Sequence, residues 1–329
     1  MMAEATSTYV VTGGTSGLGL GCARALAAAP GARVVVTGRT LDRTAGVAAG
    51  IGARPMRLDL ASLASVHRFA DELAAELTGG GLPPLRGLVC NAGLQVIGDS
   101  RTEDGFETTF GVNHLGHLAL VERLVDLFEA PARIALVASG THDPAQPTAT
   151  PSPLADADAD ELAHPPADPG EPAMRAGLRR YATSKLANVR TTYALSRRLA
   201  GRGIAVNAFD PGLMPGTGLA RDAGPVARLL WRTVARALVL LPTVHTTRTS
   251  GANLARLLTA PELAGVSGGY FVGRRPAGSS LASYQVEASE ALYRDSLRLI
   301  GAVPAGSTPS GGAAVPLDDP ERPDTSARG

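Results

Sequence analysis

The chain has 329 residues, 44% of them hydrophobic, which fits one large globular α/β domain. Its formal net charge of +1 gives no electrostatic field for nucleic acid or for an anionic membrane surface. The cysteines Cys22 and Cys90 form no disulfide framework or metal-ligand cluster, residues 1–8 lack the regions of a signal peptide, and no run of about 18 uncharged apolar residues predicts a membrane span, so we expect a cytoplasmic protein.

Short apolar runs alternate with helical patterns through the first two thirds of the chain. This alternation is typical of βαβ units and predicts an α/β fold: a doubly wound, mainly parallel Rossmann-type sheet with helices on both faces. Ligands of such folds bind beyond the carboxyl ends of the strands. We expect seven strands, at 9–12, 33–37, 54–59, 87–91, 134–139, 205–210 and 269–272. We expect helices at 18–29, 41–49, 62–77, 103–129, 178–200 and 247–258.

The first predicted strand ends in a glycine-rich turn, TGGTSGLG at 12–19, which leads into the first predicted helix. Glycines without a Cβ allow a tight turn and a close approach to a ligand. The helix N-terminus adds free N–H groups and a positive dipole end, which favour a phosphate. A plain strand-turn-helix is the alternative for such a turn by itself. The predicted cofactor-binding residues of this turn are Gly13, Thr15, Ser16, Gly17, Leu18 and Gly19.

The second predicted strand is followed by Gly38 and Arg39. Dinucleotide-binding folds usually have an acid at this place, which holds the ribose hydroxyl of NAD. Here no acid is present to repel a 2′-phosphate, and the Arg39 guanidinium can bind one. The sequence therefore favours NADP(H) over NAD(H), with a solvated loop arginine as the alternative.

The glycine spacing G-x-x-x-G-x-G, preceded by Thr12, resembles that of the short-chain dehydrogenase/reductase family. The resemblance covers about residues 8–300. It implies that Asp59 meets the adenine edge with the help of the next backbone amide, at Leu60. The same carboxylate could instead cap a helix, a role for which Ser62 competes.

Two further strand ends match family motifs that hold the cofactor. The residues Asn91, Ala92 and Gly93 match the N-A-G motif, whose small residues let the backbone lie along the adenine ribose. Pro211 and Gly212 resemble the P-G turn, and the resemblance implies that Leu213 contacts the nicotinamide carboxamide.

Tyr181 and Lys185 match the Y-x-x-x-K pattern of the family on a predicted helix. Residues four apart share a helix face, so the ammonium lies beside the phenol. A free tyrosine has a pKa of about 10, and we expect the nearby cation to lower it by favouring the phenolate. Tyr181 can then give a proton to a developing alkoxide or take one from an alcohol.

The resemblance assigns two more catalytic residues. In the family, a serine at the place of Ser139 steadies the substrate oxygen, and an asparagine at the place of Asn113 holds a water and relays protons. Ser139 could instead cap a strand end, and Asn113 could be a buried side chain that satisfies backbone groups. His114 and His117 lack a carboxylate or cysteine partner, so we interpret them as helix packing and predict no metal site.

Several stretches are similar to the retinol dehydrogenase and protochlorophyllide reductase branch of the family. They are DGFE at 104–107, NHLGH at 113–117, YATSKLAN at 181–188 and GGYF at 268–271. The interval between Ser139 and Tyr181 is also long, as in protochlorophyllide reductase. Leu213 stands where the light-driven reductases have a cysteine, which argues against photochemistry.

We expect one domain over residues 8–301, with an irregular insertion at 141–177, a substrate lid at 213–246 and a disordered tail at 302–329. The part at 225–241 carries arginines on one face and apolar residues opposite, so peripheral membrane contact is the alternative to a lid.

The predicted function is an NADPH-dependent oxidoreductase that transfers hydride to a carbonyl of a lipophilic or secondary-metabolite-like small molecule, with Tyr181 as proton donor. Reduction of a C=C or imine bond is the chemical alternative, and a catalytically silent NADP-sensing protein is the non-enzymatic one. The sequence leaves the oligomeric state open.

Overall fold

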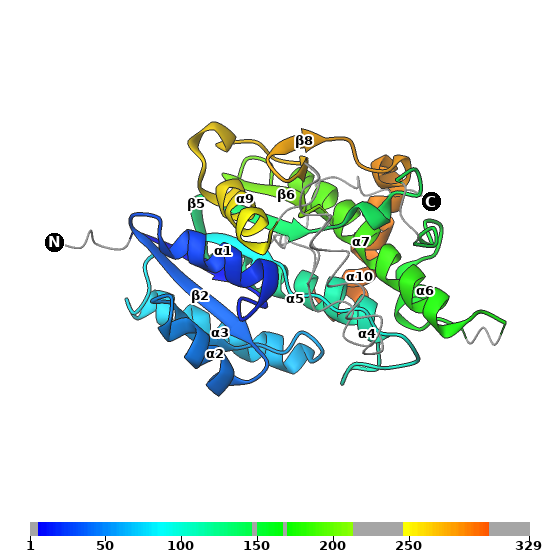
Figure 1. Cartoon of the computed structure of the whole chain (residues 1–329), viewed down its shortest axis with the longest axis horizontal. Helices are drawn as coiled ribbons and strands as arrows, with labels where there is room; N and C mark the ends of the chain where they lie inside the picture. The colour runs from blue at the N-terminus through cyan, green and yellow to red at the C-terminus, as the bar shows by residue number, and fades with distance from the viewer. Residues whose placement is uncertain (1–5, 147–149, 167–169, 213–245, 303–329) are drawn as a thin grey trace, which may run out of the picture.

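A computed structural model describes residues 6–146, 150–166, 170–212 and 246–302 of the chain. Within these ranges, eight strands form one sheet in the order β3-β2-β1-β4-β5-β6-β7-β8 (Figure 1). All neighbouring pairs are parallel except β7 and β8. The strands are β1 (Ser7–Val11), β2 (Ala32–Gly38), β3 (Arg54–Arg57), β4 (Leu85–Cys90), β5 (Phe128–Val137), β6 (Ile204–Asp210), β7 (Tyr270–Val272) and β8 (Arg275–Ala277).

The strand order reverses beside β1. The chain adds β2 and β3 on one side of β1, and then crosses over to add β4, β5 and β6 on the other side. In doubly wound sheets this switch point leaves a crevice outside the carboxyl ends of the strands, where ligands bind. The glycine-rich turn follows β1 and the Asn91 segment follows β4, so both lie at the switch point.

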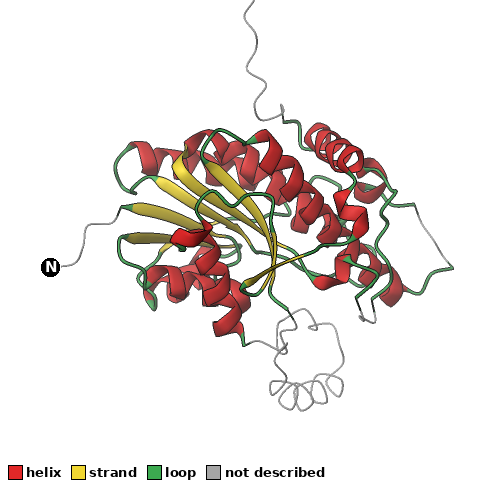
Figure 2. Cartoon of the chain, turned by 90° about the horizontal axis from the view of Figure 1, so that it is seen from above, coloured by secondary structure: helices red, strands yellow, loops and turns green. Residues whose placement is uncertain are grey.

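Helices cover both faces of the sheet (Figure 2). One face is covered by α1 (Gly17–Ala27), α2 (Leu41–Ala49) and α9 (Thr247–Thr259). The other face is covered by α3 (Leu63–Thr78), α5 (Gly116–Leu124), α7 (Ala173–Arg198) and α10 (Val286–Leu299). The sheet is therefore the middle layer of three, as the sequence predicted.

Two hydrophobic cores follow from the alternation of side chains along the strands. Val10 and Val35 pack in the core beneath α3 and α5, whereas their neighbours Val11 and Val36 pack in the core beneath α1 and α9. Because both faces are buried, the strands read as continuous apolar runs in the sequence. This packing fixes the strand ends that carry the candidate site.

The predicted count of seven strands is wrong by one. The eighth strand, β8, has only three residues, of which one is Pro276, and it pairs antiparallel with β7 at the sheet edge. Proline is tolerated at such an edge because no ladder hydrogen bond is lost there. A run this short and this polar has no strand pattern in the sequence.

The single helix predicted over 103–129 is interrupted. It consists of α4 (Thr108–Phe110), a π-helical turn η1 (Gly111–Leu115), α5 and a 3₁₀ turn (Val125–Leu127), after which β5 begins at Phe128. A π-helical turn inserts one extra residue into the helical repeat and is frequent at functional sites. Here it contains Asn113.

Two helices lie where none was predicted. The helix α10 packs Leu292, Tyr293 and Leu297 into the core beside α7. The short helix α6 (Ala159–Ala163), inside the segment expected to be irregular, begins at Asp158, whose carboxylate accepts a hydrogen bond from the Glu161 N–H at 2.8 Å. A sequence signal is present for both: Leu292, Tyr293, Leu297 and Ile300 recur at helical spacing along α10 and its C-terminal cap, and Asp158 is a helix-capping residue before α6.

Most of the predicted lid and tail lies at 213–245 and 303–329, outside the described residues. The alternative membrane contact at 225–241 and the predicted nicotinamide contact Leu213 lie there too. Among the helices that the structure describes, none has both the length and the apolar character to cross a bilayer.

Candidate active site

Four neighbouring strand ends and one long helix bring the predicted site residues to the same edge of the sheet (Figure 1). The glycine-rich turn follows β1, Asn91 follows β4, Ser139 follows β5, and Pro211 follows β6. The helix α7 contains Tyr181. A Cβ on Gly93 would lie 3.3 Å from the Asn113 Oδ1 and 3.7 Å from the Lys185 Nζ, so three predicted site residues converge there.

The predicted catalytic pair, Tyr181 and Lys185, lies on α7. The Lys185 Nζ lies 5.5 Å from the centre of the Tyr181 ring and donates a hydrogen bond to the Val137 carbonyl at 3.0 Å. Lys185 is the only lysine in the sequence, which otherwise uses arginine for its cations. Its burial lowers the pKa of the ammonium to about 8, and the Asp210 carboxylate acts in the opposite direction.

The pKa of the Tyr181 phenol is raised, not lowered as the sequence predicted. Burial is the largest cause, because it disfavours the phenolate, and the negative charge of Asp210 acts in the same direction. A hydrogen bond with the Ser139 side chain opposes them. The phenol therefore holds its proton at neutral pH.

Ser139 lies at the start of a 3₁₀ turn, Gly140–His142, directly after β5. Its hydroxyl accepts a hydrogen bond from the Thr141 N–H at 3.4 Å, and its carbonyl accepts one from the His142 Nδ1 at 2.7 Å. These bonds fix the backbone at this point, so the Ser139 hydroxyl is held near the Tyr181 phenol. Its role toward a substrate stays a prediction.

The Asn113 side chain is fully used within the protein. Its Oδ1 accepts from the Leu94 N–H at 2.9 Å, and its Nδ2 donates to the Leu94 carbonyl at 2.9 Å and to the Ser184 Oγ at 3.0 Å. These are the contacts of the alternative interpretation, a buried amide that satisfies backbone groups. The proton relay through Asn113 stays a prediction.

Thr12 connects three parts of the site, although it was not predicted as a site residue. Its Oγ1 accepts from the N–H groups of Asn91 at 2.8 Å and Ala92 at 3.0 Å, and lies 2.9 Å from the His117 Nε2. The His117 Nδ1 lies 3.1 Å from the Asn113 carbonyl, which can only accept. Burial lowers the pKa of His117 to about 4, so the ring is neutral and its one proton is on Nδ1. The single hydroxyl proton of Thr12 is shared between the His117 Nε2 and the Val89 carbonyl, which lies 3.1 Å from the Thr12 Oγ1.

His114 faces a different partner from His117. Its Nε2 lies 3.0 Å from the Ser296 Oγ of α10, and burial lowers the pKa of this ring to about 3. The two rings thus bond different elements, which agrees with helix packing. Among the described residues, no group of three or more His, Cys, Asp or Glu could hold a metal ion.

The glycine-rich turn forms a narrow cradle. Gly13 and Gly17 have positive φ angles of 64° and 56°. A Cβ on Gly19 would lie 2.4 Å from the Asn91 Nδ2, so only glycine fits there. The Ser16 side chain makes no capping hydrogen bond within the described part of the chain, which leaves N–H groups in the first turn of α1 for a ligand. These features fit a phosphate group.

The other predicted residues of this turn have distinct places. The Leu18 side chain is buried in the core beneath α1, so only its backbone can face a ligand. The Thr15 methyl group lies beside Gly38 at the end of β2, where a Cβ would approach it to 3.1 Å. Thr15 therefore connects the turn to the strand that leads to Arg39.

Two arginines lie at the ends of β2 and β3. Arg39 is exposed, and its carbonyl accepts a hydrogen bond from the Arg57 Nε at 3.2 Å. Arg57 pairs in register with Gly38, the residue before Arg39. Arg57 was not predicted as a site residue, although its place at the end of the third strand was visible in the sequence.

Asp59 follows β3 and binds its own loop. Its Oδ1 accepts from the Ala61 N–H at 3.1 Å, while the next residue, Leu60, is buried. Ser62 caps α3 by accepting from the Ser65 N–H at 3.4 Å. The helix-capping alternative for Asp59 is therefore wrong, and the adenine contact stays a prediction.

The P-G turn after β6 is held by two hydrogen bonds. The Pro211 carbonyl accepts from the Ser250 Oγ at 3.0 Å, and the Gly212 N–H donates to the Asp210 Oδ1 at 2.8 Å. Gly212 has a φ angle of 72°, which a residue with a side chain rarely adopts. Asp210, which sequence reasoning did not single out, thus lies at the centre of this turn.

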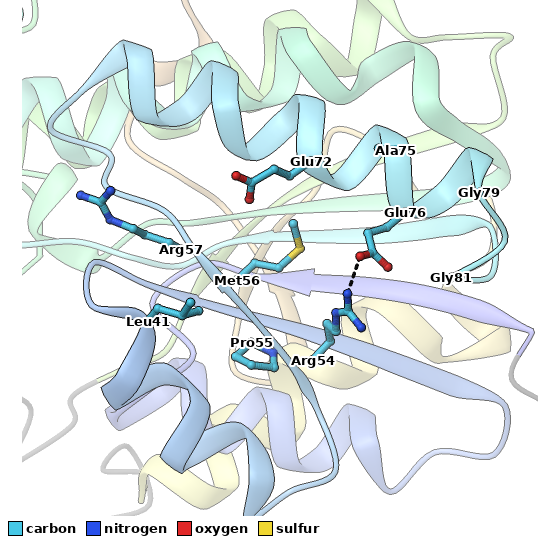
Figure 3. A pocket seen from close by; sticks show the side chains of 10 residues that line it. All are labelled: Leu41, Arg54, Pro55, Met56, Arg57, Glu72, Ala75, Glu76, Gly79 and Gly81. Atoms are coloured by element: carbon cyan, nitrogen blue, oxygen red, sulfur yellow. Dashed lines mark hydrogen bonds and ion pairs between the residues drawn. The ribbon is translucent and has the colours of Figure 1, made fainter.

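A surface hollow of about 580 Å³ lies away from these residues, between β3, the start of α2 and the end of α3 (Figure 3). Arg54 and Glu76 form an ion pair across it, and the Arg57 side chain extends away from that pair. Of the described catalytic candidates, none lines this hollow. Arg57 is among its lining residues, so the hollow reaches the end of β3 but not the predicted catalytic residues.

Comparison with solved structures confirms the predicted fold. An uncharacterised protein from Mycobacterium paratuberculosis superimposes with a TM-score of 0.67 and 25% identity, over 92% of this chain and 96% of its own. A short chain dehydrogenase from Burkholderia cenocepacia J2315, solved in complex with NADP, has a TM-score of 0.59 and 24% identity, over 82% and 96% of the two chains.

Sequence comparison gives the family. Residues 7–150 match the family model described as short chain dehydrogenase. Human retinol dehydrogenase 13 is 32% identical over 89% of this chain and 84% of its own length, and human retinol dehydrogenase 14 is 34% identical over 80% and 77%. The chain belongs to the short-chain dehydrogenase/reductase family, in its retinol dehydrogenase-like branch.

A further relative is longer than this chain. The human WW domain-containing oxidoreductase is 36% identical over 80% of this chain, which spans 60% of the length of that relative.

Proposed function

We propose that this protein is an NADP(H)-dependent reductase that acts on a carbonyl group of a lipophilic or secondary-metabolite-like small molecule. The observation that carries the proposal is the position of the sole lysine, Lys185, 5.5 Å from the centre of the Tyr181 ring at the carboxyl edge of the sheet. A protein that only sensed a dinucleotide would have no need for an amine beside a phenol.

The cofactor part of the proposal has its own support. The cradle between Gly13 and Gly19, with N–H groups free at the start of α1, suits the pyrophosphate of a dinucleotide. Arg39 and Arg57 supply cations where a 2′-phosphate would be read. Solved structures of the same fold are complexes with NADP and with NADPH. When bound, NADPH supplies the hydride.

The chain itself supplies the proton. Tyr181 stays protonated at neutral pH, because burial and Asp210 raise its pKa, and can donate this proton to a developing alkoxide. The Ser139 hydroxyl, bonded to the phenol, can bind the same substrate oxygen. Lys185, with a pKa of about 8, is mostly charged at pH 7 and stabilises the phenolate that remains.

The lipophilic substrate class is supported by relatives. Its relatives include retinol dehydrogenases and a polyprenol dehydrogenase, whose names denote long apolar alcohols. We therefore propose an apolar aldehyde or ketone as substrate. Imine and C=C reduction, which use the same proton donor, are distinguished by the test.

The test measures NADPH oxidation with retinal, prenyl aldehydes, aliphatic ketones, cyclic imines and enones. We expect turnover with the apolar carbonyl compounds. The variant Tyr181→Phe should lose roughly 100-fold or more in kcat while NADPH still binds. NADPH binding without turnover on any compound would support the sensing alternative, and an unchanged rate in Tyr181→Phe would reject the proposed proton donor.

A further inference from the structure

Asp210 is a buried carboxylate to which the proposed mechanism assigns no contact with substrate or cofactor. It ends β6 and is only 6% exposed. Both of its oxygens accept hydrogen bonds: Oδ1 from the Gly212 N–H at 2.8 Å, and Oδ2 from the Tyr270 O–H at 2.8 Å. These two donors, one from the following turn and one from β7, hold the carboxylate in a single orientation.

This orientation points the carboxylate toward the catalytic edge. A Cβ on Gly140 would lie 3.4 Å from the Asp210 Oδ2, and Gly140 directly follows Ser139. Tyr270, which fixes that oxygen, packs its ring 5.1 Å from the His142 ring of the same turn. Asp210 is therefore enclosed by the turn that carries Ser139 and by β7.

Several titratable groups face Asp210 from the elements packed around it. Tyr181 and Lys185 face it from α7. The Lys185 Nζ donates to the Val137 carbonyl at 3.0 Å, and Val137 pairs in register with Phe209, the residue before Asp210. Asp210 raises the pKa of both groups: it opposes the phenolate and favours the ammonium. His142 faces it from the 3₁₀ turn, but burial lowers the pKa of that ring and so favours its neutral form. Tyr270 faces it from β7 with a pKa raised by burial and by Asp210.

We propose that Asp210 is a positioning residue that keeps Tyr181 and Lys185 in their protonated forms, and so sets this site for proton donation, that is, for reduction. The inference rests on the proposed function only for the direction of the reaction. The electrostatic part concerns the free protein, and it can be tested whether or not a substrate is known.

The chemical consequence follows from the sign of the charge. With Asp210 ionised, deprotonation of Tyr181 places a second negative charge near the carboxylate. Deprotonation of Lys185 removes the positive charge that offsets the carboxylate. Both changes are unfavourable. The proton-donating form therefore persists to higher pH. Alcohol oxidation, which needs the phenolate, requires a correspondingly more alkaline solution.

The direct test uses the fact that Lys185 is the only lysine. Protein made with ¹³C-labelled lysine gives one side-chain ammonium signal, whose NMR titration reports the pKa of Lys185 without cofactor or substrate. We expect a midpoint of about 8 in the native chain. In Asp210→Asn the midpoint should fall by roughly one pH unit, because the stabilising charge is gone.

Two control variants separate charge from structure. Asp143→Asn removes another carboxylate that acts on His142 and Tyr270, and it should leave the Lys185 midpoint in place. Tyr270→Phe keeps the Asp210 charge but removes one donor, and it should also leave the midpoint near the native value. An unchanged midpoint in Asp210→Asn, or an equal fall in Asp143→Asn, overturns the proposal.

The kinetic test measures pH profiles with a carbonyl substrate found in the panel. In Asp210→Asn the alkaline limb of kcat for reduction should move to lower pH, and the onset of alcohol oxidation should move with it. A uniform loss of rate with an unmoved profile would show a merely structural role. If Tyr181→Phe shows that the function proposal fails, the NMR result still decides the role of Asp210.

Discussion

The Arg57 Nε donates a hydrogen bond to the backbone carbonyl of Arg39 at 3.2 Å, which joins the end of edge strand β3 to the loop after β2. The two residues are 18 positions apart, and the parallel register of β2 and β3 brings them together. Arg39, which the sequence predicted as a phosphate contact, therefore has a second arginine, Arg57, beside its backbone. We predict that both guanidinium groups contact the 2′-phosphate of a bound NADPH.

Cofactor preference should depend on both arginines. We expect Arg39→Ala and Arg57→Ala each to weaken NADPH binding about 10-fold, because each loses a charge-assisted hydrogen bond of roughly 1.5 kcal/mol. The affinity for NADH, which lacks the 2′-phosphate, should stay the same. Fluorescence titration of both dinucleotides measures the two affinities.

The matched control is Arg54→Ala. Arg54 lies on the same strand but forms an ion pair with Glu76 across the hollow of Figure 3. It should leave the NADPH-to-NADH ratio at the native value. If Arg57→Ala keeps the native ratio of NADPH to NADH affinity, the phosphate site is limited to Arg39. If Arg39→Ala also keeps this ratio, the proposed phosphate site is rejected.

The sequence predicted the sheet and the edge where the site lies because these depend on local patterns. Apolar runs such as Val34–Val36 mark strands that are buried on both faces, and polar or glycine residues follow them at the same edge. The spacing of Tyr181 and Lys185 placed both on one helix face, and the structure has them on α7.

What could not be predicted depends on contacts between distant parts of the chain. The raised pKa of Tyr181 results from burial and from Asp210, a residue 29 positions away that belongs to another element. The π-helical turn at Asn113 has no local signal, because an inserted residue leaves the apolar pattern of the helix nearly intact.

The contacts of Asn113 predict a structural cost when this side chain is lost. Asn113→Ala removes three buried hydrogen bonds, two of them to the Leu94 backbone. The free energy of unfolding should fall by about 2–3 kcal/mol, since buried backbone groups lose their partners. Urea denaturation of the protein without cofactor measures this change.

The variant Ser184→Ala is the comparison for Asn113. Ser184 accepts only one of the three bonds, from the Asn113 Nδ2, and donates to the Tyr181 carbonyl at 2.7 Å. Its stability loss should be smaller. Asn113→Ala could instead unfold at the same urea concentration as the native chain while its kcat drops. In that case Asn113 acts in proton transfer, and its contacts to Leu94 contribute little to the free energy of unfolding.

Acid should destabilise the protein through its buried histidines. Burial lowers the pKa of His117 to about 4 and that of His114 to about 3, against about 6.5 in the unfolded chain. Below pH 6.5 the unfolded chain therefore binds more protons than the folded one, so stability is fully present above that pH and falls as the pH decreases toward 4. The slope is about 1.4 kcal/mol per pH unit for each histidine.

His117→Gln should reduce this slope between pH 6 and 4 by roughly a third to a half, because one of three buried rings with a lowered pKa is gone while a polar side chain remains near Thr12. Urea denaturation at a series of pH values measures the slope. The exposed His67 on α3 provides the control, and His67→Gln should leave the slope unchanged. A native slope in His117→Gln would mean that this ring is not a source of the acid sensitivity, and that burial does not keep it neutral in solution.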